Sequence, residues 1–217
     1  VAVKVLRPGI EQRFRQDLDS YLFAAKLIER FHPPSRRLRP IAIVDTLAKS
    51  VAIEMDLRME AAAISEMDDN IKTDEGFRVP KVDWSRSARR VLTLEWIDGI
   101  PIADRDGLIA AGFDTKALGA HLMQSFLRHA MRDGFFHADL HPGNLFVDDQ
   151  GRIVAVDFGI MGRLGMKERL FLAEILHGFI KRDYTRVAEG QFQAGYEPRP
   201  HAVAQFAQAL RAIGEPP

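Results

Sequence analysis

Cysteine is absent from this chain of 217 residues, which excludes disulfide bonds and thiol chemistry and fits a reducing compartment. Neither sign of charge is in excess: 30 Lys and Arg residues balance 30 Asp and Glu residues, so the composition does not indicate nucleic-acid binding. We find no signal peptide and no apolar run of about 18 residues, the length that a membrane-spanning helix needs. The chain begins without methionine, directly in an apolar strand, so we expect it to be an internal piece of a longer protein.

Hydrophobic residues make up 47% of the sequence, enough for the core of one large domain or of two lobes. Helical spacing of apolar residues predicts helices, short β-branched runs predict strands, and glycine and proline mark turns. The strands expected are 1–5, which should be buried, 79–82 and 91–97. The helices expected are 10–31, 41–69, 114–133 ended by Gly134, 166–181, 184–194 and 201–213, with a loop over 32–40.

The most informative stretch is 137–144, His-Ala-Asp-Leu-His-Pro-Gly-Asn, followed by Asp-Phe-Gly at 157–159. Between Asn144 and Asp157, two short strands flank a turn, which predicts a hairpin that brings these two residues close together. Carboxylate and amide oxygens that converge on one spot suit a hard cation such as Mg²⁺. With Asp139 as a base upstream, the order of residues is the one by which kinases handle the phosphates of ATP.

A second feature is Glu60, a carboxylate in the apolar stripe that Ile53, Leu57 and Ile64 form on their helix. A carboxylate on a core-facing stripe is costly unless it is paired. Its neighbours three and four residues away include no basic residue, so the partner must come from elsewhere. Lys4, the single charge in the first strand, is the obvious candidate, because a strand Lys paired with a helix Glu is how kinases hold the ATP phosphates.

Each of these features has an ordinary structural alternative. Lys4 could point to water from an edge strand, and Asp-Phe-Gly could be a plain turn. Glu54 and Asp56 point in nearly opposite directions on an ideal helix, so Glu54 could form a surface ion pair with Arg58 worth about 0.3–0.5 kcal/mol. The kinase interpretation is favoured because the order and spacing of the two features agree.

With these residues in hand, the sequence resembles the UbiB family of atypical protein-kinase-like proteins of ubiquinone biosynthesis, in its bacterial form. The resemblance covers the whole chain and rests on Val-Ala-Val-Lys and Arg-Pro-Gly within 1–9, Glu-x-Asp followed by Glu at 54–60, the stretch 137–144 and the Asp-Phe-Gly. It implies an α+β, atypical kinase-like fold with two lobes. Residues 1–97 would be a partial N-lobe, starting at the Lys-bearing third strand and including a helical insert and the Glu-bearing helix. Residues 98–217 would be a helical C-lobe with the catalytic loop.

The resemblance implies a role for each residue of the catalytic centre. Lys4 would contact the nucleotide phosphates and pair with Glu60. Asp139 would occupy the catalytic-base position, while Asn144 and Asp157 would hold Mg²⁺ and through it the ATP.

Two further segments take roles from the same resemblance. The strand end at Glu95 and Ile97 would be the hinge whose backbone groups meet adenine, although Trp96 between them is expected in the core. Glu54 and Asp56 would match the family's Glu-x-Asp, which in the family meets a Lys-x-Gly-Gln motif of an N-terminal extension outside this chain.

The function implied is that of an ATP- and Mg²⁺-dependent ATPase or unorthodox kinase that supports ubiquinone biosynthesis at the cytoplasmic face of the bacterial inner membrane. Segments outside this chain would reach the membrane, and the partners would be prenylated quinone precursors or lipids and the biosynthetic complex. Ala138 replaces the Arg that pairs with a phosphorylated activation loop, and His141 stands where many kinases have a Lys near the γ-phosphate, so a protein substrate is not favoured.

Three alternatives remain open from the sequence. One is a small-molecule phosphotransferase of the aminoglycoside or choline kinase type, which shares the His-x-Asp-x-x-x-x-Asn pattern. Another is a nucleotide-gated scaffold for a lipid or a complex, with little turnover. The third is a metallohydrolase built on His137, Asp139 and His141, because imidazole and carboxylate are common zinc and iron ligands.

Overall fold

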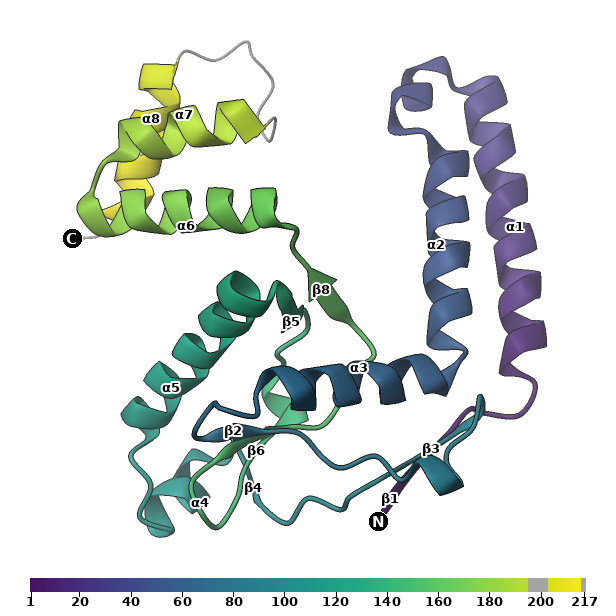
Figure 1. Cartoon of the computed structure of the whole chain (residues 1–217). Coiled ribbons are helices and arrows are strands. Elements are labelled where there is room, and N and C mark those ends of the chain that lie inside the picture. Colours follow the sequence, from purple (N-terminus) through teal and green to yellow (C-terminus); the bar gives the residue numbers. More distant parts are fainter. Residues whose placement is uncertain (195–202, 216–217) are drawn as a thin grey trace. The chain divides into compact units, whose positions relative to one another are not determined.

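The computed structural model describes residues 1–194 and 203–215, and the chain divides into two compact units (Figure 1). Unit 1 comprises Val1–Leu118 and Asp139–Ile160, and unit 2 comprises Gly119–Ala138 and Met161–Pro217. Every residue for which the sequence suggests nucleotide or family-motif chemistry lies in unit 1. The division into lobes after residue 97 stays a prediction.

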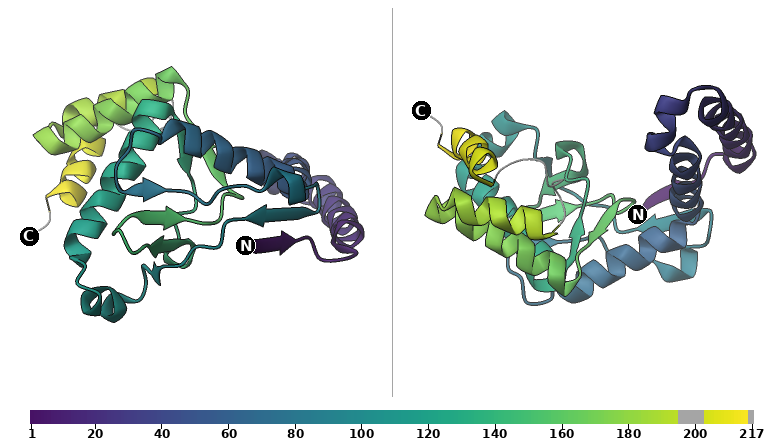
Figure 2. Two further views of the ribbon diagram at one scale, coloured as in Figure 1. Left: turned by 60° about the horizontal axis from the view of Figure 1, so that its bottom comes forward. Right: turned by 90° about the horizontal axis from the view of Figure 1, so that it is seen from above.

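The elements of unit 1 alternate between helices and short strands. In chain order they are β1 (Ala2–Val5), α1 (Ile10–Phe31), the short helix η1 (Pro33–Leu38), α2 (Pro40–Glu54), α3 (Leu57–Asn70), β2 (Phe77–Arg78), η2 (Trp84–Arg86), β3 (Val91–Leu94), β4 (Ile100–Pro101), α4 (Arg105–Ala110), η4 (Pro142–Asn144), β6 (Leu145–Val147) and β7 (Ile153–Ala155). They form a two-stranded sheet of β1 and β3 and a four-stranded sheet in the order β2-β7-β6-β4 (Figure 2).

The first strand and first helix form where the sequence places them, but β1 is not buried. It pairs antiparallel with β3 alone, with Lys4 opposite Leu92. Val1, Val3 and Val5 are each more than half exposed, because none of the described residues forms a strand on the outer edge of β1. Helix α1 has the predicted bounds, whereas the loop expected after it contains the short helix η1.

The single helix expected over 41–69 is wrong, because the chain leaves the helical conformation between α2 and α3. Asp56 is extended, and its carboxylate accepts a hydrogen bond from the backbone N–H of Arg58 (3.1 Å), as an N-cap of α3. The guanidinium of Arg58 also binds this carboxylate, at 2.6 and 2.9 Å, and lowers the pKa of Asp56 to about 2. Arg58 therefore pairs with Asp56 and not with Glu54, the surface pair that the sequence left open as an alternative.

The predicted hairpin is confirmed as β6 and β7, with Leu145 opposite Ala155 and Val147 opposite Ile153. These four side chains are buried, and β2 pairs with β7 in parallel on the other side. The strand expected over 79–82 is wrong, because β2 lies two residues earlier and only Val82 forms an isolated bridge, with Leu94. The hairpin therefore lies inside its sheet, where its backbone is supported on both edges.

Unit 2 is mostly helical. Its elements are the rest of α5 (Thr115–Arg128), a π-helical turn η3 (His129–Asp133), β5 (Phe135–His137), β8 (Met161–Arg163), α6 (Met166–Lys181), α7 (Tyr184–Ala194) and α8 (Val203–Gly214). Gly134 ends η3 with φ 66°, as predicted, and β5 pairs antiparallel with β8. The core of α7 and α8 is built on Tyr184, Val187, Ala188, Ala207 and Leu210. Residues 201–202 of the last predicted helix lie outside the described residues.

None of the helices within the described residues is both long enough and apolar enough to cross a membrane.

A buried carboxylate organises the turn of the hairpin. Asp148 is 3% exposed, and it accepts hydrogen bonds from the backbone N–H groups of Gln150 (3.1 Å) and Arg152 (2.9 Å) and from the guanidiniums of Arg152 (2.8 Å) and Arg78 (3.1 Å). Burial on its own raises the pKa of Asp148, but these donors outweigh burial and hold the pKa below its ordinary 3.8. Both carboxylate oxygens of Asp148 therefore accept hydrogen bonds, and these bonds hold the turn together.

We expect Asp148→Ala to lower the free energy of unfolding by about 2–4 kcal/mol, because it removes the carboxylate that binds the guanidiniums of Arg152 and Arg78 and leaves Arg78 with Glu95 alone. Asp149→Ala, at the exposed neighbouring position, is the matched control and should stay within about 0.5 kcal/mol of the unaltered chain. Urea unfolding measures both, and equal losses in the two variants would contradict the assignment.

Because the pKa of Asp148 is lowered in the folded chain, we expect the stability of the fold to depend on pH. Because the folded pKa of Asp148 lies below the unfolded one, its stabilisation is complete above about pH 4 and is lost as the pH falls through the folded value. The gap in unfolding free energy between the unaltered chain and Asp148→Asn should therefore be largest near neutral pH and shrink toward acid. A difference in unfolding free energy between the two proteins that stays constant from about pH 6 to pH 3 would contradict the lowered pKa of Asp148.

Candidate functional site

The ion pair predicted between the first strand and the Glu-bearing helix is present in unit 1. β1 carries Lys4 and α3 carries Glu60, and the ammonium nitrogen Nζ lies 2.9 Å from both carboxylate oxygens. The Glu60 side chain is 6% exposed, whereas the Lys4 side chain is 46% exposed. One side of the ammonium group therefore faces the helix, and the other side is open to a ligand.

Burial and neighbouring charges shift the pKa values of both partners. Burial raises the pKa of Glu60, and the bonds and charge of Lys4 offset only part of that rise. Burial lowers the pKa of Lys4, but Glu60 and Asp157 outweigh it, so that the pKa is raised above 10.5. Lys4 thus remains a cation at any physiological pH.

The aspartate of Asp-Phe-Gly joins this cluster. Its carboxylate oxygen Oδ1 lies 3.4 Å from Nζ of Lys4 and accepts a hydrogen bond from the backbone N–H of Gly159 (3.1 Å). Burial alone would raise the pKa of Asp157, but the Gly159 bond and the charge of Lys4 lower it below 3.8. The side chain is 45% exposed, so the site offers an ionised and accessible carboxylate.

Phe158, which lies between Asp157 and Gly159 in the chain, binds Glu60 on helix α3. The backbone N–H of Phe158 donates to Oε1 of Glu60 at 3.4 Å, and its ring is buried. Glu60 thereby fixes both the Lys4 ammonium and the Asp-Phe-Gly backbone. The order of residues along the chain did not predict this contact between Glu60 and the backbone of Phe158.

The hairpin brings Asn144 to the Asp-Phe-Gly, as predicted. The backbone carbonyl of Asn144 accepts a hydrogen bond from Val156, the residue before Asp157, at 3.0 Å. In the described part of the chain, the side-chain amide of Asn144 has no protein partner. It is half-buried and available as an oxygen ligand for a cation.

Asp139 lies in the exposed loop between β5 and η4. Its backbone carbonyl accepts a hydrogen bond from the N–H of His141 at 2.7 Å, and the ring of His141 in turn accepts one from the N–H of Gly143 at 3.1 Å. These bonds shape the loop that presents Asp139. Its role as a base stays a prediction.

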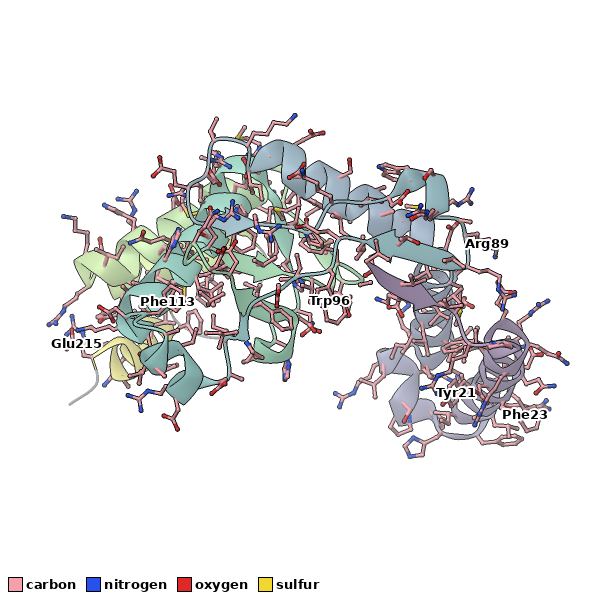
Figure 3. All side chains as sticks on the ribbon, turned by 90° about the horizontal axis from the view of Figure 1, so that it is seen from below. Tyr21, Phe23, Arg89, Trp96, Phe113 and Glu215 are labelled. Carbon is pink, nitrogen blue, oxygen red and sulfur yellow. The ribbon has the colours of Figure 1, made fainter. Side chains whose placement is uncertain are left out.

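The predicted hinge follows β3. Trp96 is 66% exposed and not in the core, because it lies beyond the last paired residue of β3 (Figure 3). The N–H of Glu95 donates to the carbonyl of Lys81 at 2.8 Å. Within the described residues, no partner takes up the carbonyl of Glu95 or the N–H and carbonyl of Ile97, so these groups are open to the edge of a base.

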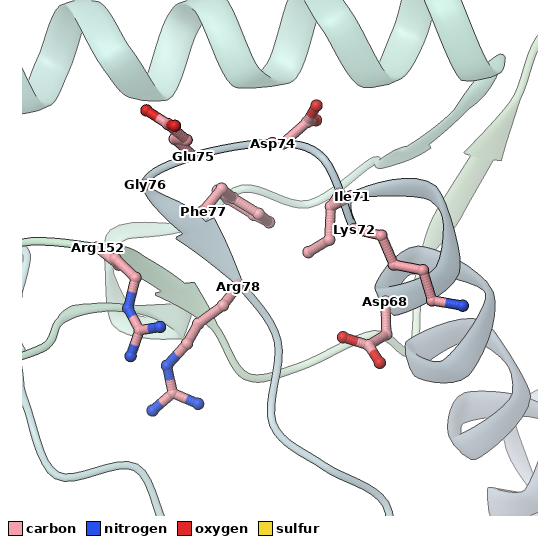
Figure 4. A pocket seen from close by; sticks show the side chains of 9 residues that line it. All are labelled: Asp68, Ile71, Lys72, Asp74, Glu75, Gly76, Phe77, Arg78 and Arg152. Carbon is pink, nitrogen blue, oxygen red and sulfur yellow. The ribbon is translucent and has the colours of Figure 1, made fainter.

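Arg78 was missed by the analysis of the sequence, yet it connects the hinge to the hairpin. Its guanidinium binds both oxygens of Glu95 (3.1 and 3.2 Å) and Asp148 (3.1 Å). The side chains of Arg78 and Arg152 line a cavity of about 400 Å³ (Figure 4). On the hinge side, Arg78 and Trp96 line a second cavity of about 640 Å³.

Glu54 and Asp56, the expected Glu-x-Asp motif, lie on either side of the break between α2 and α3. Glu54 is exposed and has no ion-pair partner among the described residues, whereas Asp56 is held by Arg58. The structure therefore does not bring Glu54 to any other predicted site residue.

The metallohydrolase alternative finds no matching site in the part of the chain that the structure describes. Over residues 1–194 and 203–215, no three His, Asp or Glu side chains are placed to hold one metal ion. His137 itself is buried in β5.

Residues 1–191 match the family model of the ABC1 atypical kinase-like domain. The chain is 39% identical over its whole length to probable protein kinases UbiB of Marinobacter nauticus and of Xylella fastidiosa, and it spans about 40% of the length of each. Among solved structures, it is similar to the Rv3197–erythromycin complex from Mycobacterium tuberculosis, with 25% identity and a TM-score of 0.71 over 96% of this chain and 52% of that one.

These similarities confirm the atypical kinase-like α+β fold expected from the sequence. The chain belongs to the UbiB family of atypical kinase-like proteins.

Proposed function

We propose that this chain binds ATP with Mg²⁺ and either hydrolyses it or transfers its γ-phosphoryl group in support of ubiquinone biosynthesis. The observation that carries the proposal is the cluster of Lys4, Glu60 and Asp157, in which a half-exposed cation and a half-exposed carboxylate lie 3.4 Å apart. A fixed ammonium group suits phosphate oxygens, and a fixed, ionised carboxylate suits the cation that accompanies them.

The residues present fit the magnesium ion. Asp157 is ionised and accessible, and the Asn144 amide has no protein partner in the described residues, so the two supply oxygen ligands from adjacent strand ends. Mg²⁺ bound there would neutralise charge on the phosphate oxygens. Lys4 would hold the phosphates, and Asp139 would accept the proton of the attacking water or hydroxyl group.

The adenine would lie against the hinge. The carbonyl of Glu95 and both backbone groups of Ile97 can meet the donors and acceptors of a base edge. In the full-length protein, we place this activity at the cytoplasmic face of the bacterial inner membrane, with prenylated quinone precursors or lipids and the biosynthetic complex as partners.

A thermal shift tests the site directly. Mg²⁺-ATP at about 100 times its dissociation constant should stabilise the chain by about 2.7 kcal/mol. Asp157→Asn should lose most of this shift, because it removes the charged metal ligand. Asp149→Asn, a carboxylate exposed on the turn of the same hairpin, should keep it. An undiminished shift in Asp157→Asn would refute the assignment.

A double substitution separates the structural role of the ion pair from the functional one. Lys4→Met should cost on the order of 1–3 kcal/mol in unfolding free energy, because it leaves the buried Glu60 unpaired. Adding Glu60→Met should restore most of that stability, yet neither variant should bind Mg²⁺-ATP. Nucleotide binding that returns with stability in the double variant would show that Lys4 acts only as a packing partner.

Two readouts decide between this proposal and its competitors. Rapid ATP-dependent phosphorylation of choline or an aminoglycoside would favour the small-molecule phosphotransferase. Nucleotide-dependent lipid binding with no measurable phosphate release would favour the scaffold.

A further inference from the structure

Helices α1 and α2 form a helical hairpin in unit 1, and each of the two helices has a single buried residue. The two helices contact each other, and η1 closes the hairpin at the end remote from β1 (Figure 1). Ala25 is the buried residue of α1, and Val51 is that of α2. The ten residues 30–39, here called the hairpin tip, combine charge with exposed apolar side chains.

The charge of the hairpin tip is entirely positive. It contains four arginines and no acidic residue: Arg30, Arg36, Arg37 and Arg39. In the described part of the chain, none of these arginines pairs with a carboxylate. The nearest carboxylate in sequence, Glu29, accepts a hydrogen bond from the backbone N–H of Ile41 (3.2 Å) at the start of α2. Among the described residues, no carboxylate neutralises the charge of the tip, although the Arg36 guanidinium binds backbone carbonyls.

Two bulky apolar side chains project between these arginines. Phe31 is 69% exposed and Leu38 is 61% exposed. On α1, Phe23 and Leu27 precede Phe31 at intervals of four residues and are also exposed, so an apolar stripe runs along the helix into the tip. Exposed aromatic and aliphatic groups beside arginines are the features of segments that lie in a lipid interface.

The hairpin tip has a defined shape. The guanidinium of Arg36 donates to the backbone carbonyl of Glu29, the ring of His32 hydrogen-bonds to the hydroxyl of Ser35 at 2.8 Å, and Arg39 turns the chain into α2 with φ 49°. Pro33 and Pro34 restrict the backbone further. A surface that is ordered before binding loses little conformational entropy on docking.

We propose that the hairpin tip docks on an anionic phospholipid surface. The arginines would meet lipid phosphates while Phe31 and Leu38 enter the boundary of the acyl region. Nucleic acid explains the arginines but not the exposed leucine, whereas a lipid surface offers phosphates and an apolar layer side by side. This contact lies within the chain itself and does not depend on the proposed ATP site.

Vesicle flotation with the purified chain tests the proposal. The chain should float with vesicles of phosphatidylcholine and phosphatidylglycerol, should bind vesicles of phosphatidylcholine alone much more weakly, and should lose binding at high salt. Arg30→Gln with Arg37→Gln should weaken partitioning about fivefold per arginine. Phe31→Ser with Leu38→Ser should weaken it about tenfold or more.

Matched control variants carry substitutions in the same helical hairpin but outside its tip. Arg13→Gln with Lys49→Gln removes the same charge from exposed positions near the other end, and Ile53→Ser removes an exposed apolar side chain there. These variants should bind vesicles as the unaltered chain does. Circular dichroism and the melting temperature should be unchanged in all variants, because every altered side chain is exposed.

Several outcomes would overturn the proposal. They are no binding to anionic vesicles, equal losses in tip and control variants, and binding that ignores salt. A Phe31-dependent dimer in size-exclusion chromatography without lipid would assign the hairpin tip to self-association instead.

Discussion

The buried carboxylate of Glu60 is the constraint on which the candidate site depends. A charge so deeply enclosed must be neutralised by a partner, and the partner comes from a strand 56 residues earlier in the chain. Lys4 reaches it because β1 pairs with β3. The same carboxylate also binds the backbone of Phe158, so the lysine, the helix and the Asp-Phe-Gly are fixed relative to one another by a single group.

A second buried carboxylate, that of Asp148, fixes the turn of the hairpin and is linked through Arg78 to the predicted hinge. Asp148 closes the turn of the hairpin that carries Asn144 and Asp157, and Arg78 connects it to Glu95. The segment proposed to meet adenine and the segment proposed to hold the metal are therefore linked by charge-assisted hydrogen bonds. Such bonds are stronger and more directional than apolar contacts, which suits groups that must keep fixed distances.

The hairpin of α1 and α2 follows a different principle. It buries little of its own surface, and its exposed side chains are of the kind that a monomeric protein seldom leaves in water without a use. We therefore propose chemistry for the cluster of Lys4, Glu60 and Asp157, and recognition of a surface for the hairpin. The two tasks are carried by separate residues, so each can be altered without the other.

The sequence by itself determined the helix α1, the hairpin β6–β7 and the Lys4–Glu60 pair, because these follow from periodicity, turn chemistry and the demand that a core carboxylate be paired. The family followed from the resemblance of the motifs, not from these physical patterns. It did not determine that Asp56 would interrupt a long helix, that Trp96 would be exposed, or that Arg78 would join Glu95 to Asp148. Asp, Trp and Arg suit several local environments equally well. For Asp56 the local cap with Arg58 decided the outcome, whereas for Arg78 it was the approach in space of Glu95 and Asp148, 17 and 70 residues away in the chain.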